Sequence, residues 1–159
     1  RAALPADHIL VLKTHPNLDP AATAVDGFDV VIDPATEIND LLMATDVLVT
    51  DYSSSIFEWA LLRRPLVLLV ADLDAYRADP GLYLDYRSEM IGAQVTDTAG
   101  VADAAGMATV DDAAWDAFIE RHLGSGVGRA SERFVDRFLG ATEVAHGRSG
   151  TLPRDVRHE

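Results

Sequence analysis

The stretch Val47-Leu48-Val49-Thr50-Asp51-Tyr52-Ser53-Ser54-Ser55-Ile56-Phe57-Glu58 determines the fold that we predict for this chain. Apolar and β-branched residues lead into Asp51 as a short buried strand. Small hydroxyl residues follow as a turn, and Ile56 and Phe57 begin the apolar face of a helix. Such a turn aims backbone N–H groups past the carboxyl end of the strand, where a phosphate can bind. Helix capping by the serines is the alternative interpretation, and the local pattern leaves both open.

The remaining chain continues this alternation of short apolar runs and helical patterns. Further strands are predicted at residues 9–12, 28–32, 66–70 and 93–96. Helices are predicted at 37–44, with Thr36 as cap, and at 54–62, 98–107, 111–122 and 129–139, with a long loop from residue 71 to residue 86. This order predicts an α/β fold with a Rossmann-like parallel sheet and helices on both faces. Core candidates in the last two helices are Trp115, Phe118, Ile119, Phe134, Val135 and Phe138.

Length and composition suggest one domain with a core. We expect a Rossmann-like domain over residues 1–146 and a flexible polar tail over 147–159. Because the chain begins with Arg1 and enters structured sequence almost directly, we also expect it to be a fragment of a longer two-domain protein. It has no cysteine, which excludes disulfides and thiolate metal sites. The sequence contains neither an apolar run of membrane-spanning length nor a secretory segment.

Net charge restricts the ligands. The formal charge is −13, so the phosphate backbone of a nucleic acid and an anionic lipid surface would both repel the chain. Lys13 is the only lysine, and side-chain contacts with a phosphate must come from it, from arginine or from histidine. No histidine pair has metal-ligand spacing, and no GxSxG motif marks a nucleophilic serine, so we predict no metal and no serine nucleophile.

The predicted strand ends place several polar groups at one edge of the sheet. His15 follows the first strand, the turn at Asp51 follows the third, and a loop that begins near Asp72 follows the fourth. Ligands bind at this edge in open α/β sheets. His15 could instead be a loop histidine that bonds to neighbouring backbone. Glu58, one helical turn past Ser54, suits a ribose diol, or it could be a solvated or salt-bridged helix residue.

The glycines at 124, 126 and 128 resemble a dinucleotide-binding fingerprint at first sight. That motif requires a preceding strand at the start of a βαβ unit, whereas a predicted helix precedes these residues. We therefore interpret the segment as a flexible connection between two helices.

Several motifs in order along the chain resemble the CDP-glycerol glycerophosphotransferases, the teichoic-acid polymerases and primases of bacterial cell walls. The resemblance spans about residues 10–138, and its most specific part is the Thr50-Asp51-Tyr52-Ser53-Ser54 core. The supporting residues are Lys13-x-His15-Pro16, Ile38-Asn39-Asp40-Leu41-Leu42, Pro65, Asp72, Tyr76 and Gly128-Arg129-Ala130-Ser131-Glu132-Arg133.

The resemblance implies the C-terminal, donor-binding domain of a GT-B enzyme that transfers glycerol phosphate from CDP-glycerol to a wall polymer and releases CMP. It implies a catalytic role for His15 beside the pyrophosphate and donor-binding roles for Lys13, Asp51, Tyr52, Ser53, Ser54, Glu58 and Asp72. CDP-glycerol would be a substrate, without cofactor or metal. The acceptor would bind the missing N-terminal domain, so this fragment alone would be inactive. The full-length protein would be cytoplasmic and peripheral at the cytoplasmic face of the membrane.

Three departures from the family pattern concern the donor. Glu58 stands where the family usually has Asp, and Val127 stands where it has an acidic residue. The loop at 79–86 lacks the arginine of the family's Arg-Gly-Phe-Tyr motif. Two alternatives therefore stay open: a GT-B glycosyltransferase that uses a nucleotide sugar, and a nucleotide-binding module without turnover.

Overall fold

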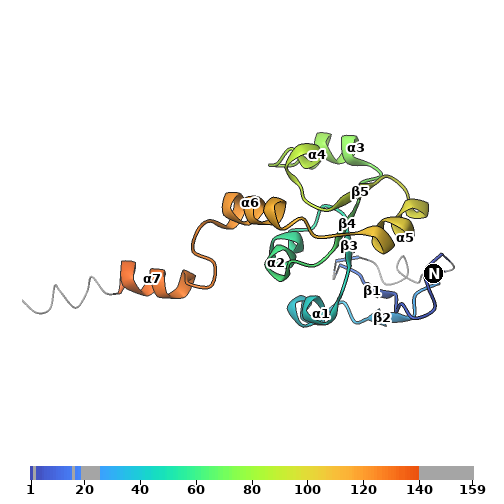
Figure 1. Cartoon of the computed structure of the whole chain (residues 1–159), viewed down its shortest axis with the longest axis horizontal. Coiled ribbons are helices and arrows are strands. Elements are labelled where there is room, and N and C mark those ends of the chain that lie inside the picture. Colours follow the sequence, from blue (N-terminus) through green and yellow to red (C-terminus); the bar gives the residue numbers. More distant parts are fainter. Residues whose placement is uncertain (2, 16, 19–25, 140–159) are drawn as a thin grey trace, which may run out of the picture. The chain divides into compact units, whose positions relative to one another are not determined.

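A computed structural model describes residues 1, 3–15, 17–18 and 26–139 (Figure 1). The chain divides into two compact units, residues 1–122 and 123–159. Pro16 and the tail predicted for 147–159 lie outside the described residues. The helix–helix connection predicted around residues 124–128 is confirmed, because it lies between helices α6 (Asp112–Leu123) and α7 (Ala130–Phe138).

The first unit contains parallel strands, as predicted. Strands β1 (Val11–Lys13) and β2 (Val30–Ile32) form a two-stranded parallel sheet. Strands β3 (Leu48–Thr50), β4 (Leu66–Leu69) and β5 (Ala93–Val95) form a three-stranded parallel sheet in that order. The α/β prediction with parallel strands is confirmed, and the described strands form two parallel sheets. Apolar runs identify strands but carry no information on which of their edges become hydrogen-bonded.

The remaining helices are α1 (Ile38–Ala44), α2 (Ser55–Leu62), α3 (Leu73–Ala78), α4 (Tyr86–Glu89) and α5 (Thr98–Met107). In Figure 1, α2 and α5 lie on opposite sides of the three-stranded sheet. The prediction of a long loop over residues 71–86 is wrong, because this segment contains α3 and the start of α4. Each of these short helices contributes one buried anchor, Leu73 and Tyr86, and such isolated anchors produce no periodicity in the sequence.

The core of the first unit forms where α2 packs on β4. Trp59 and Ala60 of α2 and Leu68 of β4 are each 0% exposed and belong to one buried cluster. The predicted core residues Trp115 and Phe118 are buried as well, and Ile119 packs partly buried against the same cluster.

The prediction of core positions in α7 is wrong for the second unit as described. Phe134, Val135 and Phe138 are 58%, 48% and 62% exposed. Their spacing predicts an apolar helix face, but it does not show whether another element packs against that face.

Arg64 holds the end of α1 from a distant point in the chain. Its Nη1 donates to the carbonyl oxygens of Met43 at 2.9 Å and Thr45 at 2.6 Å, and to that of Leu42 at 3.5 Å. The last carbonyls of a helix lack intrahelical donors, and a cation at this end also complements the helix dipole. The start of α1 is capped by the Glu37 side chain, which accepts the Asn39 N–H at 3.3 Å; Thr36 was the predicted cap.

Arg64→Ala is expected to lower the free energy of unfolding by about 1.5–3 kcal/mol, because the charged donor of several carbonyls is lost. Urea unfolding followed by tryptophan fluorescence would measure the change. Arg77→Ala, at an exposed position of α3, is the matched control and should stay within about 0.5 kcal/mol of the unchanged chain. Equal stability of the two variants would contradict the capping role of Arg64.

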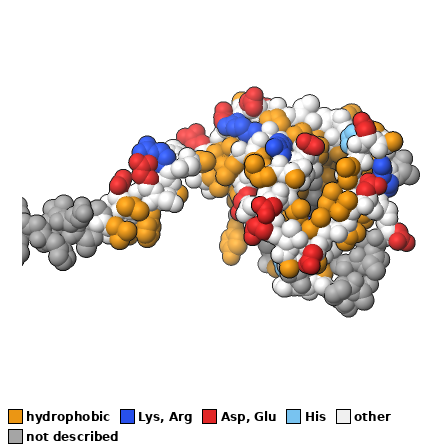
Figure 2. Space-filling model, turned by 90° about the horizontal axis from the view of Figure 1, so that it is seen from below, with side chains coloured by type: hydrophobic (Ala, Val, Ile, Leu, Met, Phe, Trp, Pro, Cys, Tyr) orange, Lys and Arg blue, Asp and Glu red, His pale blue; other side chains and the backbone are white. Residues whose placement is uncertain are grey.

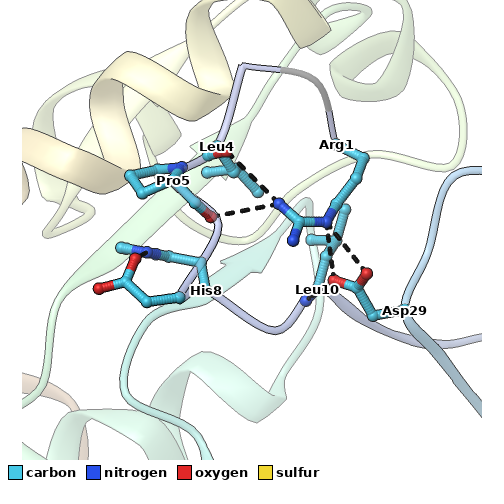
Figure 3. Close-up of polar contacts among 7 residues, drawn as sticks. Arg1, Leu4, Pro5, His8, Leu10 and Asp29 are labelled. Carbon is cyan, nitrogen blue, oxygen red and sulfur yellow. Dashed lines mark hydrogen bonds and ion pairs between the residues drawn. The ribbon is translucent and has the colours of Figure 1, made fainter.

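Asp29 joins residues that precede β1 to the sheet formed by β1 and β2 (Figure 3). Its carboxylate accepts the Leu10 N–H at 2.8 Å and the Arg1 Nε–H at 3.0 Å. The amide of Leu10, followed by the Arg1 guanidinium, lowers the pKa of the Asp29 carboxyl. Arg1 also donates to the carbonyl oxygens of Leu4 and Pro5 at 3.4 and 3.2 Å. These bonds therefore tie Arg1 and Leu10 to Asp29, the residue just before β2.

Acidic side chains are spread over the face shown in Figure 2, as the net charge of −13 leads one to expect. Apolar side chains are also exposed on this face. Within the described ranges, no helix combines the length and the apolarity that crossing a bilayer would require.

Candidate functional site

The turn between β3 and α2 is the centre of the candidate site. Strand β3 ends at Thr50, and α2 begins at Ser55. Ser53 Oγ accepts the Ser55 N–H at 3.2 Å and lies 2.8 Å from Ser55 Oγ. Ser54 occupies the cap position, yet its side chain makes no capping hydrogen bond. Ser53 therefore satisfies one amide at the start of α2, which agrees in part with the capping interpretation.

Two further amides of the turn are available to a ligand. Among the hydrogen bonds of the described residues, none uses the backbone N–H of Ser53 or Ser54. They lie just before the amino end of α2, where the helix dipole contributes partial positive charge. Unpaired N–H groups at such a position favour an anion. The turn thus combines partial capping with the donors that a phosphate requires.

Tyr52 connects the turn to the segment that follows β4. Its hydroxyl donates to Asp72 Oδ1 at 2.8 Å, and its ring stacks on Tyr76 with centroids 4.0 Å apart. Strands β3 and β4 are neighbours, so their carboxyl ends bring Tyr52 and Asp72 together as the sequence predicts. Burial, and then the hydrogen bond to the Asp72 carboxylate, raise the pKa of Tyr52.

Tyr86 is a member of the site that sequence reasoning missed. Its hydroxyl donates to the backbone carbonyl of Asp51, and its ring meets Tyr52 edge-on with centroids 5.3 Å apart. The side chain is 4% exposed, and burial raises its pKa. The sequence signal was the set of three tyrosines in the predicted loop, Tyr76, Tyr83 and Tyr86, which did not indicate which of them reaches the turn.

His15 and Lys13 make their hydrogen bonds elsewhere. The Nδ1 atom of exposed His15 accepts the Asn17 N–H at 3.2 Å, and Lys13 Nζ donates to the Pro34 carbonyl at 2.8 Å. No hydrogen bond or ion pair within the described chain joins either residue to the turn. The local bond of His15 matches the alternative interpretation of this residue, and its role beside a pyrophosphate stays a prediction.

Carboxylates dominate the electrostatics of the candidate site. Asp51, Glu58 and Asp72 are all exposed, and Glu58 lies in the first turn of α2. Within the part of the chain that the structure describes, no group of three or more acidic or histidine side chains is arranged to hold a metal ion. Attraction for a phosphate must therefore come mainly from the turn amides and the dipole of α2, not from side chains of the turn.

Parallel strands, intervening helices and the strand–turn–helix at Asp51 place this chain in the α/β class. The family described as CDP-Glycerol:Poly(glycerophosphate) glycerophosphotransferase matches residues 1–140, and the chain belongs to that family. The family predicted from the motifs is confirmed.

The curated relatives are named as teichoic-acid transferases, primases and polymerases. The chain is 34% identical over 105 residues to the teichoic acid glycerol-phosphate transferase of Staphylococcus aureus, covering 65% of this chain and 27% of that protein. It is 31% identical over 132 residues to the teichoic acid ribitol-phosphate primase of Bacillus spizizenii, covering 82% of this chain and 34% of that protein. The chain therefore spans about a third or less of these relatives.

Solved structures agree in fold. A variant of the wall teichoic acid polymerase TagF matches with a TM-score of 0.65 and 23% identity, covering 91% of this chain and 37% of that chain. Another TagF variant, soaked with CDPG, matches with a TM-score of 0.63 and 25% identity over 91% of this chain and 37% of that chain.

Proposed function

We propose that this chain is the donor-nucleotide-binding part of an enzyme that transfers glycerol phosphate, or a related polyol phosphate, from a CDP-activated donor to a teichoic-acid-type polymer. The observation that carries the proposal is the pair of unpaired amides of Ser53 and Ser54 before α2. Membership of the glycerophosphotransferase family supports the nature of the donor. Asp51, Tyr52 and Asp72 belong to the site through the contacts that surround this turn.

In the proposed reaction, a polymer hydroxyl attacks the β-phosphorus of CDP-glycerol in line. A new P–O bond forms, the bond from the β-phosphorus to the bridging oxygen breaks, and CMP leaves with that oxygen. The amides of Ser53 and Ser54 stabilise the charge on the leaving phosphate. His15 stabilises or protonates the leaving group, Lys13 adds positive charge, and Glu58 contacts the ribose diol. The hydroxyl proton passes to a base outside this chain.

The proposal assigns donor binding, not turnover, to this chain by itself. The chain covers 27% and 34% of the two relatives described above, so the acceptor and the base belong to the remainder of the full-length enzyme. We propose no metal and no cofactor. The full-length protein would act peripherally at the cytoplasmic face of the membrane, where the polymer acceptor would be presented.

Calorimetric titration of the chain with CDP-glycerol, CDP-ribitol, CDP and UDP-sugars tests the donor class. We expect binding of the cytidine nucleotides and none of the UDP-sugars. Binding of UDP-sugars without cytidine nucleotides would refute the proposal in favour of a nucleotide-sugar glycosyltransferase. Absence of binding to any of them would refute donor binding by this chain.

Ser53→Ala and His15→Ala are expected to weaken CDP binding. The loss of the Ser53 hydroxyl, which orders the turn, should cost about 2–10-fold in Kd, and the loss of a charge-assisted contact from His15 about 10–100-fold. Calorimetry would measure both constants, and Ser131→Ala on α7 is the control expected to bind normally. Unchanged affinity in both variants would show that this turn and His15 are not the donor site.

A further inference from the structure

We infer that Tyr86 is a positioning residue, whose buried hydroxyl fixes the peptide from which the phosphate-binding turn begins. The inference rests on the proposed function for its effect on a ligand, although its effect on the turn itself stands without a ligand. Tyr86 lies 35 residues after Asp51 and donates to the carbonyl oxygen of that residue.

The Asp51 carbonyl is a sensitive point of the turn. A peptide unit is planar, so a hydrogen bond to this carbonyl also fixes the direction of the Tyr52 N–H. Relative to this fixed plane, the backbone dihedrals of Tyr52 set the direction of the Ser53 N–H. Those of Ser53 then set the direction of the Ser54 N–H. The hydroxyl of Tyr86 consequently acts on the groups that would meet a phosphate, without contacting the phosphate.

The dihedrals of Tyr52 are restrained from the other side. Its ring lies against Tyr76 in a stack and against Tyr86 edge-on, and its hydroxyl donates to Asp72 Oδ1 at 2.8 Å. Packing and a directional bond together restrict a side chain more than either alone. Two consecutive residues of the turn, Asp51 and Tyr52, are therefore held by the segment that carries α3 and α4.

Tyr86 is itself firmly held, as a positioning residue must be. Its ring is 4% exposed, and its backbone carbonyl accepts the Gln94 Nε2–H at 3.0 Å. The Glu89 side chain accepts the Asp85 N–H at 3.0 Å and pairs with Arg121 at 2.7 Å. Helix α4 is thus tied to the strand β5 and the helix α6. The Tyr86 hydroxyl thus connects the Asp51 peptide to this anchored helix.

Tyr86→Phe tests the inference because it removes that hydroxyl and leaves the ring. In the free chain, amide order parameters of Tyr52, Ser53 and Ser54 should fall from about 0.85 toward 0.6. The Kd for CDP should rise about tenfold, as expected for the loss of one ordering hydrogen bond. Tyr52→Phe, which removes the bond to Asp72, should change both quantities in the same direction.

Two control variants separate positioning from general destabilisation. Tyr83→Phe removes the hydroxyl of a fully exposed tyrosine and should change neither quantity. Thr45→Val removes a part-buried hydroxyl that donates to the Leu41 carbonyl at 2.7 Å, and it should lower the melting temperature without loosening the turn.

Each outcome is decisive. Unchanged order parameters in Tyr86→Phe, or the same loss in Thr45→Val, would overturn the inference. Loosened amides with unchanged CDP affinity would overturn the inferred effect on the ligand, because the positioning of the turn would then have no bearing on CDP binding. If the unchanged chain binds no CDP while Tyr86→Phe loosens the turn, the proposed donor site fails and the positioning of the turn by Tyr86 stands.

Discussion

Trp59→Ala is expected to lower the free energy of unfolding by about 3–5 kcal/mol, a large share of the about 5–15 kcal/mol that stabilises an ordinary domain. Trp59 is 0% exposed and is the largest of the fully buried side chains. Its indole N–H also donates to the carbonyl oxygens of Arg64 and Pro65 at 3.0 and 3.2 Å. Alanine would leave a cavity between α2 and β4 and remove the donor of both carbonyls. Urea unfolding followed by far-ultraviolet circular dichroism measures the loss.

Two further variants divide this effect into its parts. Trp59→Phe keeps much of the volume and removes the N–H, so we expect a smaller loss than for alanine. Leu61→Ala, on the same helix at a side chain that is 46% exposed, controls for helix propensity and should cost about 1 kcal/mol or less. A Trp59→Ala chain as stable as Leu61→Ala would show that the contact between α2 and β4 does not stabilise this unit.

Ser53→Asp is expected to weaken CDP binding about 100-fold, because a fixed carboxylate would face the phosphate across the turn. The same change should leave folding intact or stabilise the chain by about 0.3–1 kcal/mol, since a negative charge complements the amino end of α2. Affinity and stability should therefore move in opposite directions. Calorimetry with CDP and thermal unfolding measure the two quantities on the same sample.

This pair of readouts distinguishes the two interpretations of the serines. If Ser53 were a helix cap only, aspartate would be an acceptable substitute and CDP affinity would not change. Ser131→Asp, on the exposed first turn of α7, adds the same charge elsewhere and should leave the Kd unchanged. An equal loss of affinity in Ser131→Asp would attribute the effect to net charge and not to the turn.

The arrangement of acidic groups bears on how the proposed site would hold a donor. The exposed carboxylates at Asp51, Glu58 and Asp72 surround a turn whose available donors are backbone amides. Backbone donors are neutral and lose less to desolvation than a buried cation does. A site of this kind depends strongly on the direction of its N–H groups. This dependence explains why the contacts of Tyr52 and Tyr86 matter for the proposed function.

The sequence by itself determined most of the local elements, with α3 and the start of α4 as exceptions. Apolar runs predicted the strands, and the bounds of α5, residues 98–107, match the prediction fully. The passage from β3 through Asp51 to α2 was also predicted, because a change from strand pattern to helix pattern across small polar residues is a local property. Motif order was enough to identify the family, which the match over residues 1–140 confirms.

Only the tertiary structure decided which distant groups meet. The bond from Tyr86 to Asp51 spans 35 residues, and that from Arg64 to Thr45 spans 19. Sequence patterns report periodicity and capping within a few residues, whereas these bonds depend on how strands pair and how helices pack over them. The separate pairing of β1 with β2 has the same cause. The residues of the turn could be read from the chain, but the groups that hold the turn in position required the fold.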